Sequence, residues 1–175
     1  VVVDPVMGDH GRLYATYTEE MCEEMKLLVS RADVTTPNVT EACLLTGTPY
    51  RETEDLSWWR DLLRRVADLG PRYPVLTGVP FGPDRLGVLA LDPDTGGFFD
   101  YHTPRVHDHF HGTGDIFSAA CAGAMVRGKS LPEALRLAAD FTLACIQVTC
   151  RDPNAPWYGV EFEKALHLLP GLLEG

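Results

Sequence analysis

The sequence opens with Val1-Val2-Val3-Asp4-Pro5, three β-branched residues followed by a carboxylate and a proline. A short, continuously apolar run of this kind is typical of a strand buried on both faces, as in a parallel sheet covered by helices. We therefore expect a parallel strand here, with neighbouring strands on both sides. Because no Met precedes Val1, we also expect the chain to be part of a longer protein whose first strands lie before this one.

Helical and strand-like segments alternate after this strand. Thr18 caps a predicted helix whose apolar face consists of Met21, Met25, Leu28 and Val29. The segments that follow are a short strand at 32–35, a short helix that ends at Gly47, a helix at about 55–69 and a strand at 73–77. This alternation predicts a doubly wound α/β fold with a mostly parallel sheet.

The remaining segments complete one predicted domain over residues 1–175. Strands at 86–91 and 98–102, joined by a turn-rich stretch, predict an antiparallel hairpin at the edge of the sheet. Helices begin at Gly112 and at the capping box Ser130-Leu131-Pro132-Glu133, and a Pro-rich loop at 151–158 precedes a final helix. No repeat or linker divides the chain.

Composition narrows the class of protein. With 175 residues, of which 45% are hydrophobic and 23% charged, the chain suits one globular domain. A net charge of -10 makes nucleic acid and anionic membrane surfaces poor partners. No membrane-spanning run or signal peptide is present, which leads us to expect a cytoplasmic protein. We expect reduced, buried thiols at the five cysteines, Cys22, Cys43, Cys121, Cys145 and Cys150.

The most specific local signal is Gly112-Thr113-Gly114-Asp115. Two glycines allow backbone N–H groups to converge at a helix N-terminus, where the helix dipole favours a phosphate. Asp115 in that first turn places a carboxylate beside the phosphate, as a base that takes a proton from an attacking hydroxyl requires. The alternative is a Gly-rich loop in which Asp115 only begins a helix.

Other polar residues follow predicted strands and are expected to meet at the same sheet edge. These are Asp4 to Asp9, Thr36-Pro37-Asn38 and Thr77-Gly78. The i, i+3 spacing of Asn38 and Glu41 lets one helical turn present an amide and a carboxylate to hydrated magnesium. The alternative is that this pair forms a helix cap, and both roles can coexist.

Two further groups of residues have weaker interpretations. His107, His109 and His111 alternate along the chain, a spacing that could hold a metal, although polar residues beside an active site often ligate nothing. Trp58 and Trp59 are predicted to pack against the core rather than to form a stacking platform.

Together, three motifs resemble those of pyridoxal kinases in the ribokinase-like superfamily. They are Asp4-Pro5-Val6-Met7-Gly8-Asp9, Thr36-Pro37-Asn38-Val39-Thr40-Glu41 and Gly112-Thr113-Gly114-Asp115. The resemblance spans nearly the whole chain and implies a three-layer α/β/α fold that lacks its N-terminal part. It also implies ATP-dependent phosphorylation of the 5′-hydroxymethyl group of pyridoxal, pyridoxine or pyridoxamine, with Mg²⁺, by a protein that is a homodimer when complete. A monovalent cation is left open as a further cofactor.

The resemblance assigns a role to individual residues. Asp115 becomes the general base, with Gly112, Thr113 and Gly114 as the anion hole. Asn38 and Glu41 become the magnesium-linked pair. The residues placed around ATP are Asp9 and Tyr14 near the phosphates, Thr36 and Thr77 on the phosphate side, and Val106 and Phe110 at the adenine. The vitamin-binding residues of the family lie mostly in the N-terminal part that this chain does not contain.

Several alternatives remain at this point. A hydroxymethylpyrimidine kinase shares the first two motifs, but that family resembles Gly-Thr-Gly-Cys where this chain has Asp115. A sugar kinase of the same fold and a non-catalytic nucleotide-binding fragment are also open. An NAD-binding Rossmann site is excluded, because the glycine motif lacks a third glycine and a surrounding βαβ unit.

Overall fold

A computed structural model describes residues 1–106, 110–156 and 158–174 of the chain. They form two compact units, Val1–His102 and Thr103–Gly175. The expectation of a single domain over residues 1–175 stays a prediction. Two of the three histidines that could hold a metal, His107 and His109, lie outside the described residues.

The first unit is built on a five-stranded sheet in the order β1-β4-β5-β6-β7. β1 (Val2–Val3) pairs in parallel with β4 (Val34–Thr35), β4 pairs in parallel with β5 (Tyr73–Pro80), and β5 pairs antiparallel with β6 (Arg85–Leu91). β7 (Phe98–Pro104) follows β6 at the end of the described order. The mixed sheet with β6 and β7 at its edge confirms the predicted α/β fold.

The first strand differs from its prediction in burial. Val2 and Val3 are half-buried, whereas the sequence predicted a fully buried strand. Among the described strands, β1 is at one edge of the sheet and β7 is at the other. A strand that pairs on one side leaves its other side open to solvent. The parallel pairing was correctly predicted, and the second neighbour stays a prediction.

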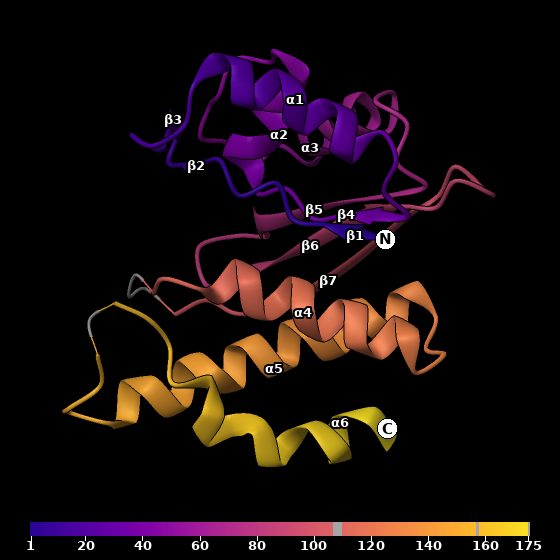
Figure 1. The fold of residues 1–175 in the computed structure, drawn as a ribbon. Helices are drawn as coiled ribbons and strands as arrows, with labels where there is room; N and C mark the ends of the chain where they lie inside the picture. Colours follow the sequence, from indigo (N-terminus) through magenta and orange to yellow (C-terminus); the bar gives the residue numbers. More distant parts are fainter. Residues whose placement is uncertain (107–109, 157, 175) are drawn as a thin grey trace. The chain divides into compact units, whose positions relative to one another are not determined.

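Three helices of this unit lie on one face of its sheet (Figure 1). They are α1 (Glu19–Val29), α2 (Val39–Thr46) and α3 (Leu56–Ala67). Local capping explains their boundaries: the Thr18 side chain accepts from the Met21 N–H, and Gly47 ends α2 with a left-handed φ of 65°.

The apolar face predicted for α1 was partly wrong. The helix buries Cys22 and Val29 and half-buries Met25, whereas Met21 and Leu28 are 43% and 57% exposed. Cys22, Met25 and Val29 follow i, i+3, i+7 spacing, and residues one position earlier lie about 100° away around the helix. Met21 and Leu28, one position before Cys22 and Val29, are apolar as well, so periodicity alone could not choose between the two faces.

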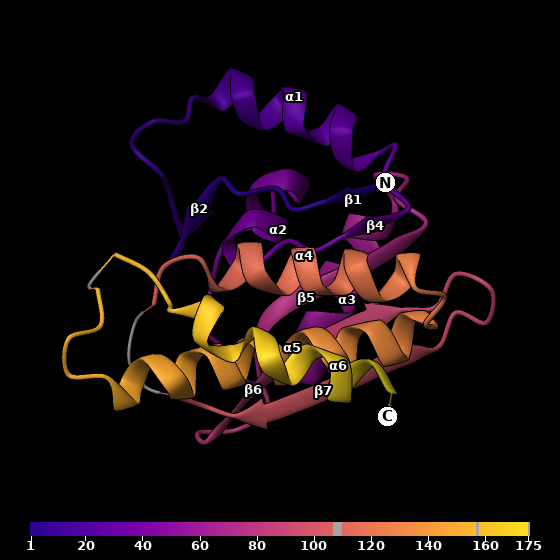
Figure 2. The ribbon, with the colours of Figure 1, turned by 60° about the horizontal axis from the view of Figure 1, so that its bottom comes forward.

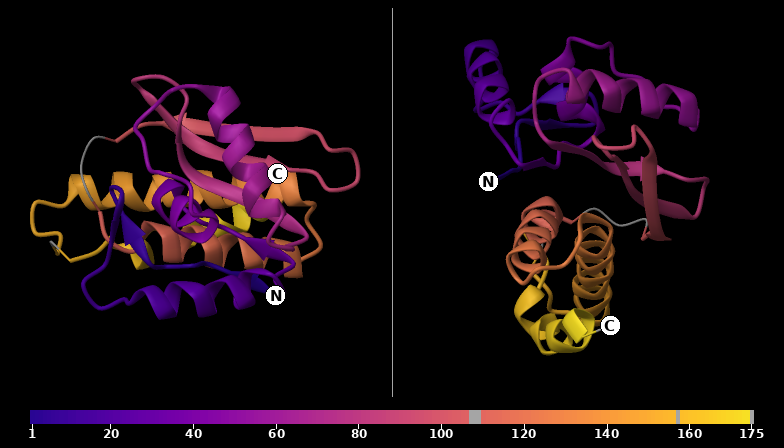
Figure 3. Two further views of the ribbon diagram at one scale, coloured as in Figure 1. Left: turned by 90° about the horizontal axis from the view of Figure 1, so that it is seen from above. Right: turned by 90° about the vertical axis from the view of Figure 1, so that its right-hand side faces the viewer.

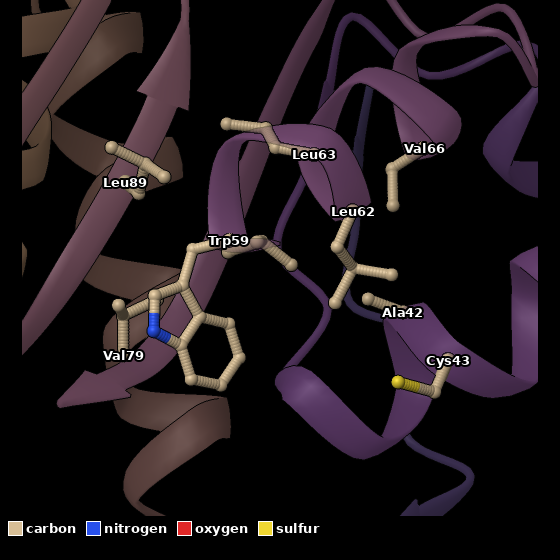
Figure 4. Close-up of a cluster of buried hydrophobic side chains, with 9 residues drawn as sticks. Ala42, Cys43, Trp59, Leu62, Leu63, Val66, Val79 and Leu89 are labelled. Carbon is tan, nitrogen blue, oxygen red and sulfur yellow. The ribbon is translucent and has the colours of Figure 1, made fainter. Parts of the chain in front are cut away.

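A core cluster of this unit joins α2 and α3 to β5 and β6 (Figure 4). Trp59, Leu62 and Leu63 of α3 are at most 2% exposed, and they pack with Ala42 and Val79 among others. Trp58 contacts Trp59 edge-on, with ring centroids 4.6 Å apart. Both tryptophans are therefore packing residues, as predicted.

The second unit is helical. α4 (Thr113–Val126) and α5 (Leu131–Arg151) lie side by side (Figure 3), followed by a 3₁₀ helix at Phe162–Leu168 and α6 (Leu169–Glu174). The capping box of Ser130 and Glu133 is present at the start of α5, as the sequence predicted. The predicted final helix is thus a 3₁₀ segment that continues into a short α-helix.

A small hairpin in the first unit was not predicted. β2 (Gly8–Asp9) and β3 (Arg12–Leu13) pair antiparallel within the stretch that we expected to be a loop, and β2 lies beside α2 (Figure 2). The turn consists of His10 and Gly11, whose φ angles are 50° and 73°. Positive φ at both central residues is the geometry of a tight two-residue hairpin turn.

Four of the five cysteines are buried and free, which confirms the prediction for those four. Cys150 is exposed, and the prediction of burial was wrong there, because this position in the last turn of α5 faces solvent. Burial raises the pKa of the Cys43 thiol to about 11, so it stays protonated. Within the described part of the chain, no helix has the length and apolar character needed to cross a membrane.

Candidate functional site

The β2–β3 hairpin presents Asp9, one of the predicted ATP-binding residues, on an exposed turn. The Asp9 carboxylate accepts the His10 N–H at 2.8 Å and lies 3.5 Å from the His10 imidazole. Tyr14, just beyond the hairpin, donates its backbone N–H to the Met7 carbonyl at 2.9 Å, and its side chain is 43% exposed. The two residues predicted to lie near the phosphates are therefore found on the hairpin and directly after it.

The first turn of α2 holds this hairpin through three hydrogen bonds. Glu41 Oε1 accepts the Met7 N–H at 3.2 Å, and Asn38 Nδ2 donates to the Gly8 carbonyl at 2.9 Å. The third bond runs from the Gly11 N–H to Thr40 Oγ1, at 2.9 Å. All three link residues about thirty positions apart in sequence, so the fold brings the first two motifs together.

The pKa of the Glu41 carboxyl group is strongly perturbed. Glu41 is 4% exposed, and its Oε2 accepts the Asn38 N–H at 2.7 Å while Asn38 Oδ1 accepts the Glu41 N–H at 2.9 Å. Burial raises the pKa of Glu41 to about 8, helped by the negative charge of Asp4 and opposed by the backbone N–H donors. The capping box proposed as the alternative role of Asn38 and Glu41 is thus present.

Thr36 and Thr77 lie next to this pair. Thr36 Oγ1 donates to Asp4 Oδ1 at 3.3 Å, and Thr77 Oγ1 donates to the Thr36 carbonyl at 3.4 Å. A parallel bridge also joins Asn38 to Thr77. The ends of β1 and β4 and the adjacent part of β5 therefore gather a polar cluster of Asp4, Thr36, Asn38, Glu41 and Thr77, as the strand-end rule predicted.

The donor chemistry of this cluster fits a hydrated divalent cation. Magnesium usually keeps several waters and is held by one or two carboxylates together with substrate phosphates. The Glu41 oxygens already accept backbone N–H groups, and the side chain is 4% exposed, which favours contact through water over direct coordination. Across residues 1–106, 110–156 and 158–174, no three His, Cys, Asp or Glu side chains form a protein-only metal cage.

The glycine motif begins α4 in the second unit. Gly112 is the N-cap with a φ of 83°, and a side chain placed there would meet no atom within 4 Å. The first N–H groups of an α-helix have no partner within the helix, and they point toward its N-terminal end. Asp115 is exposed in this first turn, and Ile116 donates its N–H to the Gly112 carbonyl at 3.1 Å. The turn thus combines anion-binding donors with an accessible carboxylate.

The predicted adenine wall is described only in part. Val106 is half-buried, and Phe110 packs against the core cluster of the second unit, which contains Phe141, Cys145, Val160 and Ala165. His111 is exposed. The predicted meeting of the polar cluster with Gly112 to Asp115 joins residues of both units and stays a prediction.

Sequence reasoning missed two residues that contact the hairpin, Thr40 and Tyr50. Thr40 accepts the Gly11 N–H, and the ring of Tyr50 lies against Gly11. A possible signal was the pair His10-Gly11, since a residue tolerant of positive φ followed by Gly favours a two-residue turn. Nothing in the sequence indicated where such a turn would dock.

The sequence of this chain is similar to a family of small-molecule kinases and to several of its members. The sequence model of the phosphomethylpyrimidine kinase family matches residues 1–155. The pyridoxine kinase of Bacillus subtilis is 30% identical over 157 residues, which cover 84% of this chain and 54% of that protein. The chain spans about half the length of the first curated relatives it matches.

Two solved structures share both fold and sequence with the chain. A candidate phosphomethylpyrimidine kinase from Bacteroides thetaiotaomicron, crystallised with pyridoxal, is 36% identical with a TM-score of 0.89, over 97% of this chain and 60% of that one. A pyridoxal kinase from Leishmania donovani, in complex with ADP and pyridoxamine, is 27% identical with a TM-score of 0.83, over 97% and 58%.

Proposed function

Since the chain belongs to the phosphomethylpyrimidine kinase family, within the ribokinase-like superfamily, we propose that the complete protein is an ATP-dependent kinase of a hydroxymethyl-bearing heterocycle. We propose pyridoxal, pyridoxine or pyridoxamine as its substrate. The observation that carries this choice is the exposed Asp115 in the first turn of α4, directly after the open Gly112 turn.

In this mechanism the hydroxyl oxygen of the substrate attacks the γ-phosphorus of ATP. The new O–P bond forms as the bond from the γ-phosphorus to the β,γ-bridging oxygen breaks, and ADP leaves with that electron pair. Asp115 takes the hydroxyl proton. The N–H groups that follow Gly112 stabilise the charge on the transferred phosphoryl group, because they are fixed before the reaction begins.

The polar cluster of the first unit serves the nucleotide. Asn38 and Glu41 would hold a hydrated magnesium ion, which neutralises phosphate charge when bound. Thr36 and Thr77 lie beside this pair on the phosphate side, and each would turn its hydroxyl hydrogen from its present acceptor, Asp4 or the Thr36 carbonyl, to a phosphate oxygen. Asp9 approaches from the hairpin and Tyr14 from the position just after it. Val106 and Phe110 would contact the adenine. This division assigns the magnesium and phosphate-side contacts to the first unit, and the adenine contacts, the anion hole and the reacting proton to the second.

A hydroxymethylpyrimidine kinase is the second candidate function. The matching family model is described by the related phosphomethylpyrimidine kinase activity, and a Bacillus subtilis relative carries both activities in its name, which favours this candidate. The pyridoxal-bound Bacteroides structure favours the first candidate, because that protein shares the family description and yet was crystallised with pyridoxal. Asp115, where the hydroxymethylpyrimidine kinases resemble Gly-Thr-Gly-Cys, supports the same choice.

The test compares substrates on the complete protein with Mg-ATP. We expect a higher kcat/KM for pyridoxal than for hydroxymethylpyrimidine or ribose, with pyridoxal phosphate formation followed by absorbance. A higher kcat/KM for hydroxymethylpyrimidine would replace the first candidate with the second. Nucleotide binding without turnover of any of these alcohols would indicate a non-catalytic nucleotide-binding protein.

A further inference from the structure

The turn of the β2–β3 hairpin is packed against Tyr50. A Cβ atom built on Gly11 would lie 2.6 Å from Cδ1 and 3.0 Å from Cγ of the Tyr50 ring. The first distance is shorter than real Cβ atoms show and the second is tighter than most of their contacts, so a side chain at this position would have to displace the Tyr50 ring. Gly11 also has a φ of 73°, which glycine adopts without strain. Two independent constraints therefore require glycine at this position.

The same glycine is held from α2. The Gly11 N–H donates to Thr40 Oγ1 at 2.9 Å, and Thr40 is 3% exposed. Gly11, Thr40, Cys43 and Tyr50 are among the residues that line a pocket of about 290 Å³ beneath the turn. The turn is thus held by the Thr40 hydrogen bond and by the Tyr50 ring, and both residues belong to the first unit.

The hairpin needs this support because its own strands are very short. β2 and β3 have two residues each, and an isolated two-stranded hairpin is marginally stable at best in water. Contacts that hold the His10–Gly11 turn also fix the position of Asp9, which directly precedes His10 in the chain. A loop fixed before ligand binding loses less conformational entropy when the ligand arrives.

We propose that Thr40 and Tyr50 are positioning residues that dock the His10–Gly11 turn and thereby place Asp9 for the nucleotide. This inference rests on the proposed kinase function. Thr40 acts through its hydroxyl group and Tyr50 through its ring. Burial, followed by the negative charges of Glu52 and Asp9, raises the pKa of the Tyr50 phenol, so the side chain is neutral against the turn.

Docking can be measured without any nucleotide, by trypsin cleavage after Arg12. Arg12 is exposed in β3, and cleavage there requires the hairpin to leave its place. Thr40→Val removes the hydroxyl group at nearly constant size, and Tyr50→Ala removes the ring. We expect each to speed cleavage after Arg12, while Thr40→Ser and Tyr50→Phe keep the wild-type rate. Cleavage after Lys129, in the second unit, is the control for global unfolding.

Positioning is measured on the complete protein with the same four variants. We expect Thr40→Val and Tyr50→Ala to raise the KM and Kd for ATP by about 10-fold, the effect of one lost hydrogen bond or contact, with kcat at saturating ATP nearly unchanged. Thr40→Ser and Tyr50→Phe should restore both constants. A purely structural role would lower the melting temperature, but it would not raise the KM for ATP while leaving kcat unchanged.

A double substitution tests the contact itself. Gly11→Ala should speed cleavage after Arg12, because its Cβ would collide with the Tyr50 ring. In the Tyr50→Ala background the collision is absent, so the added effect of Gly11→Ala should be smaller than in the wild type. Equal effects in the two backgrounds would contradict the contact.

The outcomes separate this inference from the proposed function. Unchanged cleavage after Arg12 in both Thr40→Val and Tyr50→Ala would overturn the docking. Faster cleavage with an unchanged KM for ATP in an active kinase would overturn the positioning role alone. If the wild-type protein binds no ATP, the proposed function fails first, and the positioning role fails with it whatever the cleavage rates show.

Discussion

Glu41 Oε1 accepts the backbone N–H of Met7 at 3.2 Å, across 34 positions of the chain. The other oxygen of this buried carboxylate accepts the Asn38 N–H, so one side chain ties the end of the first motif to the start of α2. The carboxyl group can carry its charge here only at a cost, because it is removed from water and lies near Asp4. This relationship leads to the first two predictions.

The stability of the protein should fall as pH rises through the range in which Glu41 ionises. Its pKa is about 8 in the folded state, against 4.5 as the ordinary value, so the folded state keeps a proton that the unfolded chain releases. The stabilisation is fully present below about pH 4.5 and is lost as pH rises through about 8. Urea unfolding without magnesium should show this slope in the wild type and a flatter one in Glu41→Gln. Parallel slopes would mean that Glu41 ionises normally.

Glu41→Gln should also weaken the use of Mg-ATP. The substitution keeps an oxygen for the Asn38 N–H but cannot ionise, so it cannot supply the negative charge that Glu41 gains when it releases its proton to a cation. About 10- to 100-fold more magnesium should therefore be needed for half-maximal activity. Glu133→Gln is the matched control, since Glu133 occupies the same capping-box position in α5. A magnesium titration that is the same in both variants would leave Glu41 as a helix cap only.

Asp115→Asn should separate catalysis from nucleotide binding. The amide keeps the size of the side chain at the start of α4 but cannot accept the proton, so kcat should fall by about 10²- to 10⁴-fold while ATP binding survives. Turnover of pyridoxal and calorimetric ATP titration measure the two effects, and Asp94→Asn on the exposed β6–β7 loop is the control. Near-normal turnover would remove the catalytic role, whereas loss of ATP binding would indicate a structural or metal-holding carboxylate.

Leu63→Ala should destabilise the first unit by about 2–5 kcal/mol, because it opens a cavity in the cluster that joins α2 and α3 to the sheet. Leu63 is 0% exposed, whereas Leu27 on α1 is 60% exposed. Leu27→Ala should therefore change the free energy of unfolding by less than about 0.5 kcal/mol. Denaturant unfolding measures both variants, and equal losses would contradict the assigned core.

Gly47→Ala should cost about 1–2 kcal/mol through backbone strain alone. Gly47 ends α2 with a φ of 65°, and a Cβ atom there would meet nothing within 4 Å. Gly47→Asn should cost less, because Asn adopts the left-handed conformation more readily than Ala. An equal free energy of unfolding for the two variants would show that φ is not the source of the loss.

Local chemistry made the helix boundaries predictable from the sequence alone. Thr18, Asn38 with Glu41, Gly47, and Ser130 with Glu133 cap helices through hydrogen bonds or backbone conformations that span a few residues. The parallel strands were also predictable from the sequence, because short apolar runs that alternate with helices favour a parallel sheet. The buried face of α1 was misjudged, since Met21 and Leu28 are as apolar as Cys22 and Val29, and only the packing partners of the helix select one pair.

The sequence by itself determined the α/β alternation, the helix caps and the order of the three polar motifs. Only the tertiary structure decided that Glu41 is buried with the Met7 N–H on one oxygen, that Thr40 receives the Gly11 N–H, and that Tyr50 covers the turn. Caps and strand patterns depend on neighbours within one or two turns of chain. A pKa raised by burial, or a ring against a glycine, depends on which distant segments the fold brings into contact, and no local pattern encodes that.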